Sequence, residues 1–304
     1  MDFDLIIINF NTPQLTIDCI ESAYASYPRA KFNVIVVDNA SSDNSLVLIK
    51  SKFPNITLVS SPYNLGYAGA INLGASHSVS DILILSNSDI IFLENSFRKL
   101  IEPINLNRAD ICGPQQLYPN YKWQESFGIF PGLKLAILDL LLVNTIRRSF
   151  LRKFFNWKST KLSYKYVDFV DGAIIACSKS IFDSVNGFDT DFSFYSEETA
   201  FCYSAKLMGA KIMYVPDSVL IHYRGASYGP SKIPIDYIEK MIHSKIKFCN
   251  KFLNRTETRW FCILEKWHFL VLHILNKFFK PLDPKYGNNY LEIYKIWGKI
   301  QNEI

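Results

Sequence analysis

The N-terminal third of the chain alternates continuous apolar runs with segments of helical periodicity. The apolar runs predict strands that are covered on both faces, at residues 5–10, 34–38, 56–60 and 82–86. The intervening segments predict three helices. The first begins at Pro13 after the N-cap Thr12, the second follows residues 41–43 and runs to Lys52, and the third spans residues 69–77.

This alternation predicts an α/β fold with a mostly parallel sheet, because parallel strands need helical crossovers between them. Small polar residues cluster just after each predicted strand, at residues 9–12, 38–43, 64–69 and 87–89. In parallel sheets the carboxyl ends of the strands share one edge, where ligands bind. The four clusters therefore predict one binding site at that edge.

The remainder of the chain has a different pattern. Residues 133–155 form an apolar and then basic helical stretch, and residues 167–177 predict a strand. A helix from Lys179 to near Gly187, a second helix ending at Gly209, and strands at 211–215 and 219–223 follow, and the chain is helical from Ile235 onward. We expect a catalytic domain at 1–232, with halves 1–115 and 116–232, and a C-terminal helical extension at 233–304.

Composition narrows the class of protein. The chain is 49% hydrophobic with a net charge of +5, which is too mild to predict a nucleic-acid partner. No acid lies between Asp139 and Asp168, whereas seven bases do, a pattern that suits phosphates, anionic lipid headgroups or a solvated face. The six cysteines are scattered among apolar neighbours, which predicts reduced core residues. With no signal peptide evident, we expect a cytoplasmic protein.

Two polar clusters carry candidate nucleotide-binding residues. Asp38 ends a predicted strand, where its carboxylate could accept hydrogen bonds from a nucleobase or cap the following helix. Small and amide residues then line a strand-to-helix turn where a phosphate or ribose could approach, or which is only a flexible turn: Asn64, Gly66, Gly69 and Asn72. Neither GxGxxG nor GxxxxGK[ST] occurs at these turns, which disfavours dehydrogenases and P-loop NTPases.

Three further groups could carry chemistry. Asn87 and Asp89 share a face in extended backbone, and Asp89 could ligate Mg²⁺ or Mn²⁺, unless the segment is only a polar turn. Glu197 and Glu198 begin a helix, where one of them could act as a general base or both could be ordinary first-turn acids. His222, with Arg224 close behind it, could face a metal or a leaving diphosphate, or could be a buried hydrogen-bonded histidine.

The order of these segments is more specific than any of them alone. Strand-ending "NFNT" is followed by "VVDNASSDNS", "NLGYAGAINLG", "ILSNSD", "DGAIIACSKSIFDSVNGFDTDFSFYSEET" and "AKLMGAKIMYVPDSVLIHYRGAS". This order resembles the inverting glycosyltransferases of family 2, in particular the rhamnosyltransferase-like branch of bacterial surface polysaccharide synthesis. The resemblance covers residues 4–229 and implies a GT-A fold.

The resemblance also implies a role for each candidate. Glu198 would be the catalytic base and Glu197 its partner, with Asp89 and His222 at the metal. Asn87 to Asp89 would occupy the position of the family's DxD motif. The nucleotide and donor sugar would be bound by Asn11, Thr12, Asp38, Asn64, Gly66, Gly69, Asn72, Asn87, Asp89, Asp171, Gly172 and Arg224.

The implied reaction is a single displacement that moves a sugar from a nucleoside-diphosphate sugar, dTDP-rhamnose in this branch, to a saccharide acceptor that is often lipid-linked. A divalent cation, Mg²⁺ or Mn²⁺, is the implied cofactor. The amphipathic stretches 133–155 and 259–280 could contact the inner face of the cytoplasmic membrane, or could pack within the protein or on a second subunit.

The chain departs from the family pattern near the predicted base. Where the family usually has another acid and then an arginine, this chain has Ala200 and Tyr203-Ser204, and we consider Arg224 as a replacement cation. These departures keep open a weakened homologue that acts as a binding or scaffold subunit. A nucleotidyltransferase is a third reading, although "NFNTPQ" lacks the Gly- and Arg-rich loop of that class.

Overall fold

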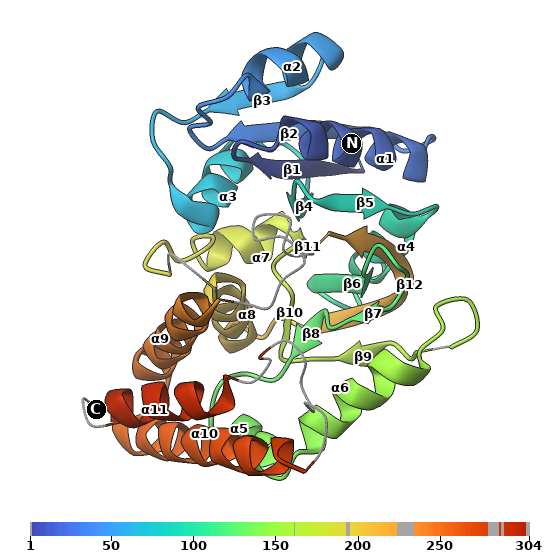
Figure 1. The fold of residues 1–304 in the computed structure, drawn as a ribbon. Coiled ribbons are helices and arrows are strands. Elements are labelled where there is room, and N and C mark those ends of the chain that lie inside the picture. The colour runs from blue at the N-terminus through green and yellow to red at the C-terminus, as the bar shows by residue number, and fades with distance from the viewer. Residues whose placement is uncertain are drawn as a thin grey trace. The chain divides into compact units, whose positions relative to one another are not determined.

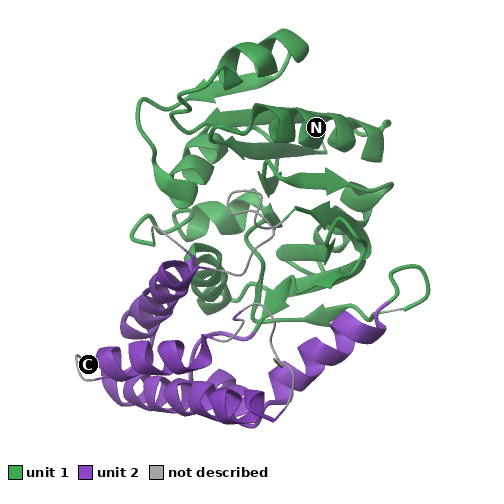
Figure 2. Cartoon of the chain, in the orientation of Figure 1, with its two compact units in different colours: residues 1–128, 156–193, 197–224 green, residues 129–155, 194–196, 225–304 purple. Residues whose placement is uncertain are grey.

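A computed structural model describes residues 2–160, 162–192, 195–223, 234–278, 286 and 289–301. The chain divides into two compact units (Figure 2). Unit 1 comprises residues 1–128, 156–193 and 197–224, and unit 2 comprises residues 129–155, 194–196 and 225–304. The domain boundary expected at residue 232 lies outside the described residues. In the described part of the chain, no helix has the length and apolar content needed to span a membrane.

Unit 1 is built on a ten-stranded sheet (Figure 1). Its continuous path runs in the order β3 (Thr57–Ser60), β2 (Phe32–Asp38), β1 (Phe3–Asn9), β4 (Ile82–Asn87), β11 (Ile174–Ser178), β6 (Ile111–Leu117), β12 (Ile212–His222) and β5 (Ile90–Phe92). Two short strands lie off this path: β7 (Trp123–Gln124) pairs with β6, and β9 (Lys165–Tyr166) pairs with β12. A separate antiparallel pair joins β8 (Phe127–Gly128) to β10 (Phe169–Val170).

Most of the sheet is parallel, as the alternating pattern predicts. Strand β1 pairs in parallel with both β2 and β4, β2 pairs in parallel with β3, and β6 pairs in parallel with β12. The exception in the middle is β11, which is antiparallel to both of its neighbours, β4 and β6. The predicted mostly parallel α/β sheet is therefore confirmed.

The register of the parallel strands brings their polar ends together. Asn9 lies opposite Asp38, and Asp38 lies opposite Ser60. On the other side of β1, Ile8 lies opposite Asn87. Because these strands run in the same direction, the predicted polar clusters after β1, β2, β3 and β4 do share one edge of the sheet.

Helices cover both faces of this sheet. One face packs with α1 (Pro13–Ser26) and α4 (Ser96–Asn105), where Phe3 and Phe97 have ring centroids 5.0 Å apart. The other face packs with α3 (Gly66–Ser76), where a Cβ on Gly74 would lie 2.4 Å from Cγ2 of Ile6. Glycine at this position therefore lets α3 approach the sheet closely. Helix α2 (Ser45–Lys52) links β2 to β3, and α7 (Lys179–Ser184) and α8 (Glu197–Leu207) follow β11.

Three predicted elements differ in detail. The strand expected at 167–177 is split into β10 and β11 by Asp171 and Gly172. The two strands expected at 211–215 and 219–223 form the single strand β12, whose register shifts between Val215 and Val219. In unit 2, the helical stretch 133–155 is broken at Leu142, which has a left-handed φ of 59°.

Unit 2 is helical. It contains α5 (Leu133–Leu140), α6 (Val143–Phe154), α9 (Ile235–Phe252), α10 (Arg255–Asn276) and α11 (Tyr290–Gln301). Asn254 starts α10 with a capping box, which satisfies backbone groups at the helix end. Phe261 and Trp297 pack edge to face with centroids 5.8 Å apart, which joins α10 to α11. The sequence-based expectation of helix from Ile235 onward matches the start of α9.

Candidate active site

At the sheet edge, Asp38 is held by residues of two strands. Its Oδ1 accepts hydrogen bonds from Asn9 Nδ2 and from Ser41 Oγ, both at 2.6 Å, and its Oδ2 accepts from the backbone N–H of Ser41 at 3.1 Å. The residue is only 1% exposed. These contacts make Asp38 a brace between β1 and β2, and its predicted contact with a nucleobase stays a prediction.

Asn11 and Thr12 continue this network from the end of β1. Asn11 has a left-handed φ of 53°, and its Oδ1 accepts a hydrogen bond of 2.8 Å from the backbone N–H of Ser42. The hydroxyls of Thr12 and Ser88 share a hydrogen bond of 3.0 Å. Thr12 thus connects the start of α1 to the segment between Asn87 and Asp89, so the first and fourth predicted clusters are in contact.

The turn before α3 is tied to β2 by a residue that the sequence analysis did not single out. Asn39 accepts a hydrogen bond of 2.8 Å from the backbone N–H of Leu65 and donates to Asn64 Oδ1 at 3.1 Å and to the carbonyl of Gly66 at 3.2 Å. Gly66 has φ +69°, which other residues rarely adopt. A Cβ on Gly69 would lie 2.9 Å from Cβ of Leu65, so this position also favours glycine.

Asn72, which was expected to face a phosphate or ribose, bonds to the protein backbone in this structure. Its Oδ1 accepts from the backbone N–H of Phe188, and its Nδ2 donates to the carbonyl of Phe188, both at 2.8 Å. These two bonds fix the segment between α7 and α8 onto α3. The structure thus gives Asn72 a positioning role, and its predicted contact with the donor stays a prediction.

Tyr67 marks the place where the separate parts of the site converge. Its hydroxyl donates a hydrogen bond to the carbonyl of Gly172. The pKa of this hydroxyl is raised well above its ordinary value, first by burial and then by the negative charges of four carboxylates: Glu197, Glu198, Asp171 and Asp89. Asp89, the predicted metal ligand, therefore lies near the same tyrosine as Glu198, the predicted catalytic base, and its partner Glu197.

Asp89 and His222 face each other within unit 1. Nε2 of His222 lies 3.6 Å from Oδ1 of Asp89, and the two side chains are only 6% and 16% exposed. Oδ1 of Asp89 is buried and has no hydrogen-bond partner among the residues that the structure describes. A buried carboxylate oxygen that lacks a donor is costly, which is a reason to look for a ligand that would complete it.

Two buried glutamines fix the tautomer of His222. Nδ1 of His222 lies 2.9 Å from Oε1 of Gln116 and 2.6 Å from Oε1 of Gln124. The amide nitrogens point elsewhere, because Gln116 Nε2 donates to Asp171 Oδ1 at 3.3 Å and Gln124 Nε2 donates to the carbonyl of His222 at 3.1 Å. Both oxygens can only accept, so Nδ1 carries a hydrogen, and Nε2, the nitrogen on the side of Asp89, is the one that could ligate a metal.

This arrangement fits a hard divalent cation. A carboxylate oxygen that lacks a donor and an imidazole lone pair are both ligands for such an ion. In the described ranges, no group of three or more His, Cys, Asp and Glu side chains is placed to hold a metal. Mg²⁺ and Mn²⁺ sites on phosphate substrates need only one or two protein ligands, because phosphate oxygens and water supply the rest.

Glu197 and Glu198 begin α8, and the pKa of each of their carboxyl groups is raised. Burial, followed by the charges of Glu197 and Asp171, raises the pKa of Glu198 to about 8. Burial, together with Asp171, raises the pKa of Glu197 to about 7. Both residues keep intermediate exposure, although Oε2 of Glu197 is itself buried. A carboxylate whose pKa is near 7 is suited to take up and release a proton at neutral pH.

The break between β10 and β11 shapes the space around Glu198. A Cβ on Gly172 would lie 3.1 Å from Cβ and 3.2 Å from Cγ of Glu198, so the absence of a side chain there makes room for the glutamate. Asp171 accepts a hydrogen bond of 3.0 Å from the backbone N–H of Ala173. The structure therefore brings Asp171 and Gly172 next to the carboxylate pair, and their contact with the donor stays a prediction.

Arg224 and Ala200 are the two remaining positions that the sequence analysis discussed. Arg224, the suggested replacement cation, lies outside the described residues. Ala200, where the family usually has an acid, is 1% exposed on the buried face of α8. A carboxylate at this position would have to enter the core or displace it, so the structure at this turn is adapted to a small apolar residue.

The functional residues that sequence reasoning missed are polar and buried, or half-buried in the case of Tyr67: Asn39, Tyr67, Gln116 and Gln124. Tyr67 lies inside a motif that was already noted, so an aromatic residue among glycines was a usable signal. Gln116 and Gln124 carried no signal in their spacing, because the partner that gives them a role, His222, is distant in the chain.

Comparison with known proteins agrees with this geometry. The model of the family "Glycosyl transferase family 2" matches residues 4–161, more than half of the chain. An N-acetylglucosaminyl-diphospho-decaprenol L-rhamnosyltransferase of Mycobacterium tuberculosis is 24% identical over 209 residues, which are 65% of this chain and 68% of that protein.

Solved structures show the same fold. A mannosyltransferase from Pyrobaculum calidifontis, in complex with GDP-Man and Mn²⁺, has a TM-score of 0.57 at 15% identity over 99% of this chain and 87% of its own. GalNAc-T7 with UDP, GalNAc and Mn²⁺ has a TM-score of 0.60 at 13% identity over 96% of this chain and 54% of its own. The expected GT-A fold is therefore confirmed, and the chain belongs to glycosyl transferase family 2.

Proposed function

We propose that this chain transfers a sugar with inversion from a nucleoside-diphosphate sugar to a saccharide acceptor. The observation that carries this proposal is the convergence around Tyr67 of the carboxylate pair Glu197 and Glu198 with Asp89. Glu197 and Glu198 supply a base of suitable pKa. Asp89 supplies a ligand for the cation that accompanies a diphosphate. A direct displacement needs these two functions on opposite sides of the sugar.

In the proposed reaction Glu198 is the general base. Its carboxylate takes the proton of an acceptor hydroxyl while the hydroxyl oxygen forms a bond to the anomeric carbon of the donor sugar. The bond from that carbon to the diphosphate oxygen breaks, and the nucleoside diphosphate leaves with the electron pair. Because one displacement occurs, the configuration at the anomeric carbon inverts. Glu197 keeps the pKa of Glu198 high through its charge.

On the donor side, the residues at the carboxyl ends of the strands hold the nucleotide. Asn11, Thr12 and Asp38 lie at the nucleotide edge, and Asn64, Gly66 and Gly69 form the turn that faces the ribose and diphosphate. Asp89 and His222 would hold Mg²⁺ or Mn²⁺, and the ion would neutralise charge on the leaving diphosphate. Two similar structures contain Mn²⁺ with a nucleotide, which supports this assignment.

The proposed donor is dTDP-rhamnose and the proposed acceptor is a lipid-linked saccharide. The support is the M. tuberculosis relative, whose name specifies L-rhamnose and a decaprenol diphosphate carrying N-acetylglucosamine. Such a reaction would place the chain in bacterial surface polysaccharide synthesis, in the cytoplasm and peripheral on the inner face of the membrane. The amphipathic segments 133–155 and 259–280 are the proposed membrane contacts.

A weakened homologue that serves as a binding or scaffold subunit is the second candidate, and Ala200 is the observation that favours it. Against it stands the cost of keeping two adjacent carboxylates partly buried, which a scaffold does not need. A nucleotidyltransferase is the third candidate, and it would act on a nucleoside triphosphate.

One assay separates the three. Purified protein is screened by thermal shift against nucleotide sugars with Mn²⁺, and release of nucleoside diphosphate is then measured with the stabilising donor and a saccharide acceptor. The proposal predicts acceptor-dependent release that EDTA removes. Donor binding without release indicates the scaffold, and release of pyrophosphate from a nucleoside triphosphate indicates the nucleotidyltransferase.

A further inference from the structure

Helix α6 in unit 2 has an inverted distribution of side chains. Its buried residues are the polar Asn144 and Thr145, at 4% and 2% exposure. Asn144 Nδ2 donates a hydrogen bond of 2.7 Å to Asp139, which fixes the helix to the end of α5. The apolar residues of α6 instead face outward, which is the reverse of the arrangement expected for a helix that only packs on a core.

The outward residues form one continuous stripe, which we call the α6 stripe. It consists of Val143, Ile146, Phe150 and Phe154, which are 47%, 62%, 60% and 59% exposed. Spacings of three and four residues place side chains on the same face of a helix. The rings of Phe150 and Phe154 lie next to each other with centroids 4.8 Å apart. An exposed apolar patch of this kind marks an interaction surface.

The charged residues of α6 itself are all basic, and by helix geometry Arg147 and Lys153 flank the α6 stripe whereas Arg152 lies on the opposite face. Arg147, Arg152 and Lys153 lie on the same helix, and Nζ of Lys153 lies 5.3 Å from the centroid of the Phe154 ring. No Asp or Glu occurs between Asp139 and Asp168. A partner for this surface must therefore be apolar in its interior and negatively charged at its boundary.

We propose that the α6 stripe docks on an anionic lipid bilayer, with the two phenylalanines in the interface and the flanking bases Arg147 and Lys153 at the headgroups. A helix with apolar residues on one face and cationic residues at its flanks lies in the plane of such an interface. A protein partner would need a complementary acidic rim, whereas a bilayer that contains anionic lipid supplies this charge everywhere. This inference extends the proposed lipid-linked acceptor, and it is tested without donor or acceptor.

Unit 2 has a second exposed apolar row, on α10, which serves as a comparison. Trp260, Trp267, Ile274 and Phe278 recur along one face at 53%, 50%, 46% and 76% exposure. Around this row the charge is mixed, because Glu257 lies in the first turn of α10. In Figure 2, α6 and α10 both lie along the lower edge of unit 2. The charge pattern selects α6 as the segment whose binding depends on anionic lipid.

The test is flotation of the purified full chain with vesicles of phosphatidylcholine, alone or mixed with phosphatidylglycerol. Wild type is expected to float only with the anionic vesicles. Phe150→Ser with Phe154→Ser should weaken binding by at least ~10-fold, because the apolar contact is lost. Replacing Arg147 and Lys153 with Gln should weaken it by ~5-fold for each base and reduce its salt dependence, whereas Arg152→Gln, on the opposite face of α6, should have no such effect.

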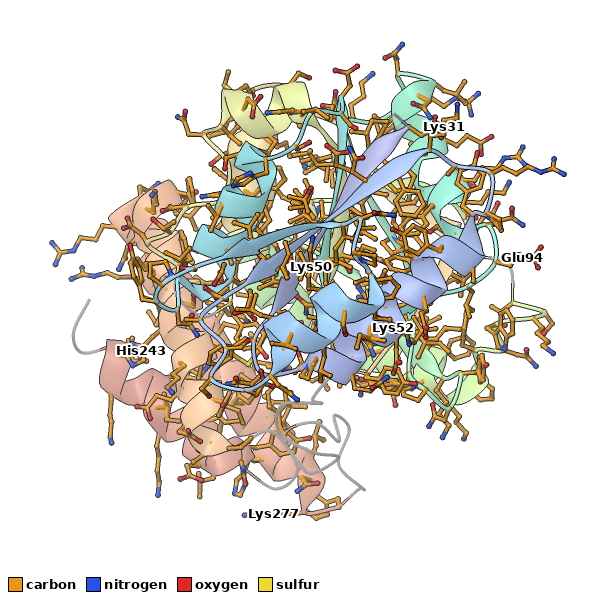
Figure 3. All side chains as sticks on the ribbon, turned by 90° about the horizontal axis from the view of Figure 1, so that it is seen from above. Lys31, Lys50, Lys52, Glu94, His243 and Lys277 are labelled. Atoms are coloured by element: carbon orange, nitrogen blue, oxygen red, sulfur yellow. The ribbon has the colours of Figure 1, made fainter. Side chains whose placement is uncertain are left out.

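Two matched variants test whether the effect belongs to α6. Gln at Lys31 and Lys50, which are exposed on unit 1 (Figure 3), removes the same charge elsewhere and should leave binding unchanged. Ser at Trp260 and Trp267 removes the α10 aromatics and should leave the dependence on anionic lipid intact. The melting temperature of each variant is measured as a control for folding, because Arg147 and Arg152 are only partly exposed whereas the other altered side chains are exposed.

A local probe gives a second readout. All six native cysteines are buried, so a cysteine introduced at Phe150 can be labelled selectively with an environment-sensitive fluorophore. Its emission should shift to the blue with anionic vesicles, while the same label at Val79, 80% exposed on unit 1, should not respond.

Three results would overturn the inference. They are the absence of flotation of wild type with anionic vesicles, flotation of the Phe150→Ser and Phe154→Ser variant at the wild-type level, or a dimer in ultracentrifugation that this variant dissociates. The last result would assign the stripe to a second copy of the chain. Nucleoside diphosphate release with a soluble acceptor is measured in parallel. The α6 variants should retain it, so failure of the membrane inference and failure of the proposed function are distinguishable.

Discussion

Nε2 of His222 and Oδ1 of Asp89 lie 3.6 Å apart because strand β12 pairs with β5. In that pairing His222 lies opposite Ile90, the residue after Asp89, and the backbone N–H of Tyr223 donates a hydrogen bond of 3.0 Å to the carbonyl of Asp89. The sheet therefore fixes both backbones, and the buried glutamines fix the imidazole. The pair is prepared for a cation before any ligand arrives.

The first prediction concerns the glutamine that holds His222. Gln124→Leu removes an acceptor from Nδ1, so the imidazole can take the other tautomer and lose its lone pair at Nε2. We expect the affinity for Mn²⁺, measured by EPR titration with nucleoside diphosphate bound, to fall by about 10-fold. Gln115→Leu is the control, because Gln115 bonds to Tyr214 instead. Equal losses in both variants would contradict a specific role for Gln124.

Asp89→Asn separates function from stability. The substitution keeps the size of the side chain but removes the charge that would bind the cation. Because Oδ1 of Asp89 is buried without a donor in the described part of the chain, the unliganded protein should be as stable as wild type or more so in differential scanning calorimetry. Stimulation of turnover by Mn²⁺ should disappear. A clear loss of stability would instead assign Asp89 a structural role.

Gly172→Ala tests the space next to the base. The new Cβ would lie 3.1–3.2 Å from Cβ and Cγ of Glu198, so the glutamate must shift. We expect kcat to fall by about 10²-fold, as for small misplacements of catalytic groups, with the affinity for nucleoside diphosphate retained. Gly298→Ala, on α11 with only the Lys266 side chain at 3.5–3.6 Å, should leave kcat unchanged.

The raised pKa values predict a pH dependence. The base must be ionised, and the coupled pair has pKa values of about 7 and about 8, so kcat/KM should rise as the pH increases through this range. Glu197→Gln removes a charge that raises the pKa of Glu198, so its profile should move to lower pH. Glu265→Gln alters a buried carboxyl of similarly raised pKa in unit 2 and should not move the profile.

The parts of the fold that the sequence predicts well are those with local signals. Strands β1, β2, β3 and β4 are continuous apolar runs, and the polar residues after them mark the site. Strand β6 gave no such signal, because "ICGPQQL" contains Gly, Pro and two Gln although all seven residues are buried. The partners of its two glutamine side chains include residues distant in sequence, namely Tyr214, Asp171 and His222.

In the candidate site, too, some features have a local sequence signal and others depend on tertiary packing. The positions of Asp89, Glu197 and Glu198 at element ends could be identified from type and order. What could not be identified is which atom bonds to which, as Asn72 shows by bonding to the backbone of Phe188. Amide side chains bind ligand and backbone equally well, so their role depends on tertiary packing.

The measurement that tests the central claim most directly is a single-turnover comparison of wild type with Glu198→Gln, combined with calorimetric titration of nucleoside diphosphate and Mn²⁺. The amide cannot take the acceptor proton, but it leaves the donor side of the site intact. The account predicts that transfer falls by about 10²-fold or more, while nucleotide affinity stays within about 2-fold of wild type. Transfer by Glu198→Gln at close to the wild-type rate would contradict the assignment of Glu198 as the base.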